Sequence, residues 1–153
     1  MGKCRFTIAL AALAAVLTAS NASAKPIQVI IISTMEFGVV AADGTFPGSV
    51  TINPLTGTKT VGGGVYDFGG SHQPLHFDIK GDKGALYNIT LPFSVTLTSG
   101  TNSMTLGNFT VDRPLIGVID KGKLHTYLGG TLQVAAGQAA GAYSGMIDIT
   151  VNY

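Results

Sequence analysis

The last thirteen residues of the sequence, from Gly141 to Tyr153, repeat with a period of two. Apolar side chains stand at odd positions, and polar ones fill most even positions after residue 146. Successive side chains of a strand point to opposite faces, so this pattern predicts one extended strand with a buried edge that reaches the last residue. We interpret this stretch as a candidate assembly and core strand that contains Gly141, Tyr143, Ile147, Ile149, Val151 and Tyr153. Tyr153 is interpreted as a core anchor.

Residues 1–24 predict a cleaved secretory signal peptide. Lys3 and Arg5 precede an apolar run over residues 6–19, and the stretch Ala22-Ser23-Ala24 matches the cleavage pattern. The apolar run is shorter than the roughly 20 residues that a membrane-spanning helix needs. We therefore expect export through the inner membrane to the periplasm, the outer surface or the extracellular space, with no transmembrane segment in the mature chain.

The mature chain, residues 25–153, is expected to be a single domain, because its length is typical of one. The only cysteine, Cys4, leaves with the signal, which excludes a disulfide, a thiolate metal site and a cysteine nucleophile. Seven basic and eight acidic residues remain after Lys3 and Arg5 are removed from the nine basic ones, a net charge of −1. This balance offers no basic face for nucleic acid and no basic membrane-surface helix.

The mature sequence is a series of short strands separated by glycine-rich turns. Residues 26–33 predict a strand buried on both faces, and residues 74–80 a strand with Leu75, Phe77 and Ile79 on its inward face. Residues 81–84 predict a hairpin turn, and residues 86–98 a strand with an edge position or a bend at Pro92. About eight such strands predict an all-β fold, an antiparallel immunoglobulin-like β-sandwich. A closed barrel is the less favoured alternative.

Two glycine-containing pairs interrupt the later strands. The pair Gly107-Asn108 predicts a β-bulge within residues 103–111. The pair Gly129-Gly130 predicts a bend within the strand at residues 124–135.

No stretch of the sequence predicts catalysis, a cofactor or a metal. His72 and His76 precede and enter a strand, where four-residue spacing does not place them on one helical face, and His125 has no acidic neighbour in sequence. Residues 62–64 are three glycines, but no helix is expected after them to bind phosphate. We therefore expect a protein that is not an enzyme.

Several local motifs together carry a family resemblance. They are Met35-Glu-Phe37-Gly38, Ala85-Leu-Tyr87-Asn-Ile89-Thr-Leu91-Pro92, Met104-Thr-Leu-Gly-Asn108-Phe109, Leu128-Gly129-Gly130-Thr-Leu132-Gln-Val134, Gln138-Ala-Ala-Gly141-Ala-Tyr143-Ser-Gly145 and Val151-Asn-Tyr153. Over about residues 26–153 the chain resembles the bacterial domain-of-unknown-function 4402 (DUF4402) family of small exported β-sandwich proteins. Its ending is also similar to the last strand of chaperone–usher pilins and of spore coat protein U domains.

This resemblance implies a fimbrial or cell-surface role for the protein. In pilin-like assemblies a periplasmic chaperone holds the subunit, and copies of the chain or related subunits then join by strand addition. The N-terminal donor, or alternatively the subunit's own first strand, would contain Ile27, Val29 and Ile31.

The sequence leaves two hypotheses about function open. The first is a structural, pilin-like subunit that assembles through β-strand pairing, with an apolar segment shared between copies. The second is a self-contained monomeric binding module of the periplasm or cell surface, in which residues 26–33 pair within the chain. Only residues 25–34 precede Met35, which leaves little length for both a donor strand and a first strand.

Overall fold

The computed structural model describes residues 25–153, so the predicted signal peptide lies outside the described residues. These residues form 14 strands and no helix, which confirms the all-β prediction. The strands are β1 (Gln28–Ser33), β2 (Glu36–Phe37), β3 (Val40–Ala42), β4 (Gly48–Ile52), β5 (Lys59–Gly63), β6 (Val65–Asp67), β7 (His72–Gln73), β8 (Leu75–Lys80), β9 (Leu86–Thr90), β10 (Ser94–Ser99), β11 (Asn102–Val111), β12 (Ile116–Val118), β13 (Lys123–Val134) and β14 (Thr150–Asn152). Within this part of the chain nothing resembles a long apolar helix that could cross a membrane.

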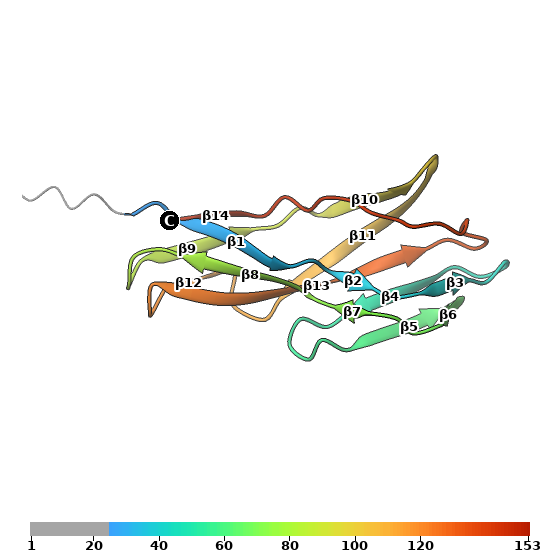
Figure 1. Ribbon diagram of the computed structural model, residues 1–153, viewed down its shortest axis with the longest axis horizontal. Helices are drawn as coiled ribbons and strands as arrows, with labels where there is room; N and C mark the ends of the chain where they lie inside the picture. Colours follow the sequence, from blue (N-terminus) through green and yellow to red (C-terminus); the bar gives the residue numbers. More distant parts are fainter. Residues whose placement is uncertain (1–24) are drawn as a thin grey trace, which may run out of the picture.

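A seven-stranded antiparallel sheet forms the larger layer (Figure 1). Its order is β1-β8-β13-β11-β10, and β4 and β5 extend it from a second position on β13. One edge of β13 pairs first with β8 and then with β4, while its other edge pairs with β11. The long strand β13 therefore joins the two ends of the molecule.

A three-stranded sheet, β12-β9-β14, covers one end of the larger sheet. The core between these two layers contains Leu75, Phe77, Ile79, Tyr87, Ile89, Ile119 and Leu128. These residues come from β8, β9, β13 and the segment after β12, so both layers contribute to this core. At this end the chain forms a closed β-sandwich.

The other end of the larger sheet has no comparable second sheet within residues 25–153. Its core contains Val50, Val65, Leu97, Met104, Leu106, Leu132 and Val134. The side chains packed over this core come from residues 35–42 and from Tyr143 and Ile147, among others. The small pairs β2–β7 and β3–β6 lie here in place of a full layer.

Three sequence predictions are wrong in detail. The strand count exceeds eight, because short strands form within segments predicted as loops. Residues 86–98 form two strands, β9 and β10, which belong to different sheets on either side of Pro92. The turn at residues 81–84 is not a hairpin, since β8 and β9 also lie in different sheets.

Two glycine-containing pairs lie where the sequence predicts irregular strands. The register of β11 against β13 shifts between Gly107 and Thr110, and Asn108 has a φ of 49°, as the predicted bulge requires. Gly129 and Gly130 stand where β13 changes its partner from β8 to β4.

Candidate functional site

A large open groove lies over the uncovered end of the larger sheet. One wall is residues 34–42, which include β2 and β3, and the other is residues 138–148, which precede β14. The groove has a volume of about 1210 Å³. In Figure 1 the second wall is the red segment that runs beside β10 toward β14. No pattern in the sequence predicts this groove.

Core side chains form the floor of the groove. They are Leu75, Leu97, Met104, Leu106, Leu132 and Val134, each at most 8% exposed. Two apolar residues of the walls remain exposed beside them, Val39 at 59% and Met146 at 88%. An apolar floor with exposed apolar rims is typical of a surface that binds another segment.

The first wall pairs along one side only. Its backbone bonds go to residues 65–73, through β3–β6, β2–β7 and the hydrogen bond that the Val39 amide donates to the Gly69 carbonyl at 2.8 Å. The edge that faces the groove pairs with no strand among residues 25–153.

The second wall is bonded even more sparsely. Over residues 139–149, the backbone of Ser144 alone bonds to a strand within the described part of the chain, through hydrogen bonds of 3.1 and 2.8 Å with Thr98 of β10. The Tyr143 hydroxyl donates to the Ala139 carbonyl at 2.7 Å and lies 2.8 Å from Nε2 of Gln138. This wall is therefore held at a few points and keeps an open edge.

The predicted C-terminal strand is shorter than expected. Only residues 150–152 form a strand, β14, which pairs with β9, while residues 145–149 are irregular. Ile149 and Val151 pack on the closed core, as Ile147 and Tyr143 do on the open one. Gly141 lies against β10, where a Cβ would clash with the Ser99 side chain.

Tyr153 is not the buried anchor that the pattern predicted. It is 54% exposed, and its hydroxyl bonds to the backbone carbonyl of Lys25. Tyr153 therefore lies beside Lys25, the first residue that the structure describes.

Residues 28–33 form an edge strand and are not buried on both faces. β1 pairs with β8 along one side, and Ile31 is 52% exposed. Val29 is also exposed, whereas Ile27 packs partly against the closed core. The first strand thus pairs within the chain but remains accessible.

The three histidines occupy different strands. His72 is exposed on β7, His76 is on β8 and His125 is on β13. The structure brings His76 and His125 together, with ring centroids 5.7 Å apart, and places Asp78 beside both. Sequence reasoning missed this group because His125 has its acidic neighbour on the adjacent strand.

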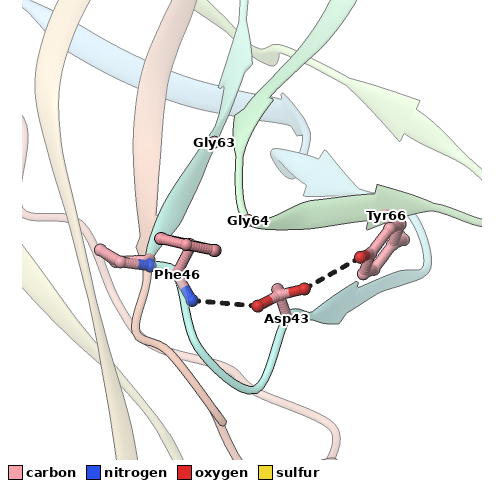
Figure 2. Close-up of a pocket in the computed structure, with 6 residues that line it drawn as sticks. Asp43, Phe46, Gly63, Gly64 and Tyr66 are labelled. Carbon is pink, nitrogen blue, oxygen red and sulfur yellow. Dashed lines mark hydrogen bonds between the residues drawn. The ribbon is translucent and has the colours of Figure 1, made fainter.

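Figure 2 shows a second hollow, of about 440 Å³, near Asp43, Phe46, Gly64 and Tyr66. Oδ1 of Asp43 accepts hydrogen bonds from the amides of Thr45 and Phe46, at 2.7 and 3.0 Å. Oδ2 accepts one from the Tyr66 hydroxyl at 2.9 Å. Both oxygens already hold the loop in place, so we interpret Asp43 as structural.

The same contacts predict a pH dependence of stability. The amide of Thr45, followed by that of Phe46 and the Tyr66 hydroxyl, lowers the pKa of Asp43 below its usual value of 3.8. A lowered pKa in the folded state means that the stabilisation is complete above about pH 4 and is lost as the pH falls through the folded pKa. We expect the difference in melting temperature between wild type and Asp43→Asn to shrink below about pH 4. A difference that stays constant at acid pH would contradict this assignment.

Comparisons with other proteins identify the family but no characterised relative. Neither the curated proteins nor the solved structures contain a significant match to this chain. The family model described as domain of unknown function (DUF4402) matches residues 27–153, nearly all of the described chain. The chain therefore belongs to the DUF4402 family.

Proposed function

We propose that the protein is an exported, non-enzymatic structural subunit, similar to a pilin, that assembles through β-strand pairing. Its groove would accept an extended apolar segment from a second copy of the chain. The observation that carries this proposal is the floor of core side chains between two walls whose facing edges have no partner strand among residues 25–153. Unpaired strand edges favour the addition of another strand.

The proposed occupant is residues 25–33 of the second copy. In an extended segment every second side chain points to the same face, so Ile27, Val29 and Ile31 share one face that suits an apolar floor. Nine residues in an extended conformation span about 30 Å, comparable to the nine residues of the wall at 34–42.

Strand exchange would increase the number of partners of the donated segment. In its own subunit β1 pairs with β8 alone and leaves its other edge open. In the groove the segment would pair with both walls and bury its apolar face, at about 25 cal/mol per Å² of apolar area. The loss of β1 would leave the edge of β8 unpaired, which is an energetic cost of the exchange. Before assembly, a strand of a periplasmic chaperone in the groove would keep a second copy from entering it.

Head-to-tail donation would produce a polymer. Each copy would offer its own residues 25–33 and receive the same segment in its groove. Such a contact joins two different surfaces, and it forms open filaments when the rotation does not close a ring. We therefore expect extracellular or surface-attached fibres.

A reversible disulfide provides the test. Gln28 and Lys80 are exposed Cα partners on β1 and β8, and residues 25–153 contain no cysteine. In the double variant Gln28→Cys, Lys80→Cys, oxidation ties β1 to its own subunit. We expect this variant to stay monomeric when oxidised and to form higher oligomers when reduced, as measured by size-exclusion chromatography with light scattering.

Two controls accompany this experiment. The single variant Lys80→Cys can link only two chains by an intermolecular disulfide, so it shows how much such a bond adds to the size of the oligomers. Wild type should polymerise in both redox conditions. Polymerisation of the oxidised double variant would show that β1 does not need to leave β8, which would overturn the proposed donor. A monomer under all conditions would overturn assembly between copies.

The second candidate function is the self-contained binding module. The observation that favours it is the internal pairing of β1, which matches β8 from Gln28 to Ser33 with one register shift. In this case the groove would bind an extended apolar segment of another protein, and β1 would stay in place. A stable monomer of both the oxidised and the reduced variant is the expected result for this function.

A further inference from the structure

Three metal-ligating side chains meet on the face of the larger sheet that points away from the core. Leu75, Phe77 and Ile79 of β8 face the core, so His76 and Asp78 alternate to the other face. His125 of β13 is the register partner of Asp78 and therefore stands on the same face. β8 and β13 are neighbouring strands of the large sheet (Figure 1).

The potential ligand atoms converge on one point. Nδ1 of His125 lies 2.7 Å from Oδ1 of Asp78, and Nε2 of His76 lies 3.7 Å from the same oxygen. One nitrogen or oxygen atom from each residue lies within 4.8 Å of the others. Side chains at this separation can enclose a single ion after small rotations, which the exposed His125 allows.

Two of these atoms are buried without a hydrogen bond. Oδ1 of Asp78 and Nε2 of His76 are shielded from solvent and have no hydrogen-bond partner within residues 25–153. Nδ1 of His125 is close to Oδ1, but the two atoms lack the geometry of a hydrogen bond. Asp78 as a whole is only 2% exposed. Buried polar atoms in proteins are nearly always satisfied, so an unsatisfied pair that faces a third lone-pair donor points to a ligand.

Neighbouring side chains hold the group in position. Nζ of Lys123 lies 2.8 Å from Oδ2 of Asp78 and leaves Oδ1 free. The Tyr127 ring stacks on His76 with centroids 4.4 Å apart and an interplanar angle of 18°. Such outer contacts orient metal ligands in known sites.

We propose that His76, Asp78 and His125 form a binding site for a divalent zinc-class metal ion. Nε2 of His76, Oδ1 of Asp78 and Nδ1 of His125 would be the three protein ligands, and water would occupy the fourth position. Two imidazoles with one carboxylate suit Zn²⁺, which takes nitrogen and oxygen ligands at about 2.0–2.2 Å in tetrahedral geometry. Mg²⁺ prefers an octahedral set of oxygens, so it does not fit this group.

Titration calorimetry of the full chain, purified without a histidine tag, tests the site with Zn²⁺ alone. We expect one Zn²⁺ per chain, and an affinity at least ten times lower in both His125→Ala and Asp78→Asn. His125 is exposed at the surface of the sheet, so the loss of its ring leaves the core intact. Outer-shell substitutions alone cost metal sites about 10–100-fold in affinity, and direct ligands cost no less.

His72→Ala is the matched control, because His72 is an exposed histidine on β7 outside this group. It should bind Zn²⁺ as wild type does, and Mg²⁺ should produce no binding heat. The proposal is overturned if wild type does not bind Zn²⁺, if His125→Ala retains full affinity, or if His72→Ala loses as much affinity as His125→Ala. The result is independent of strand exchange, since β8 and β13 remain paired in either assembly state.

Discussion

Replacement of Phe77 with alanine should lower the free energy of unfolding by about 3–5 kcal/mol. Phe77 is fully buried and belongs to the core between the two layers. It lies in the centre of β8, with Ile31 of β1 and Thr126 of β13 as its register partners. The truncation removes apolar contacts and leaves a cavity that strands on both sides cannot fill. Urea denaturation followed by circular dichroism measures the change.

Phe93→Ala is the matched control for this substitution. Phe93 stands between β9 and β10 and is 95% exposed, so its loss should change stability by no more than about 0.5 kcal/mol. A similar loss in both variants would mean that the aromatic content of the chain matters but the position does not. That result would contradict a closed core between β8 and the three-stranded sheet.

The sequence was sufficient to predict one central strand, at residues 74–80, and the face that this strand buries. The alternation in residues 74–80 predicts the inward side chains Leu75, Phe77 and Ile79, and all three are in the core. Partners were not predictable in the same way. A local pattern fixes the conformation of a segment, whereas pairing depends on contacts between distant segments, so the turn at residues 81–84 suggested a hairpin that does not form.

The C-terminal segment shows a second limit of local patterns. Several of its apolar residues do face the core, yet most of the segment forms no ladder. A Cβ at Gly145 would come within 2.7 Å of both the Thr96 carbonyl and the Leu97 side chain, so this residue approaches β10 too closely for a larger side chain. The period of two therefore predicted burial better than it predicted pairing.

Neither candidate site could be predicted from the sequence. The groove exists because, among the described residues, no second sheet covers one end of the larger sheet. A local sequence pattern cannot predict that a layer is missing. The histidine and aspartate group needs the register of β8 against β13. His76 and Asp78 share a face by their spacing, but only the pairing of Asp78 with His125 completes the group.

Replacement of Gly129 with alanine should lower the free energy of unfolding by about 1–3 kcal/mol. A Cβ at this position would lie 2.6 Å from Cδ of Pro54 and would also clash with the Ile52 carbonyl oxygen. Both atoms belong to the chain at the end of β4, and the backbone there would have to move. Thermal denaturation and urea denaturation measure the loss, with Gly44→Ala as the control because a Cβ at Gly44 meets no atom within 4 Å.

The same substitution should also disturb the floor of the groove. Directly after Gly129, β13 pairs with β4, and this pairing aligns Val50 with Leu132 in the core below the groove. If β4 moves away from β13, the apolar floor loses the shape that a donated strand would contact. We therefore expect Gly129→Ala to weaken both folding and oligomer formation, whereas Gly44→Ala should affect neither. A variant as stable as wild type would show that the close approach of β4 to Gly129 does not constrain this end of the sheet.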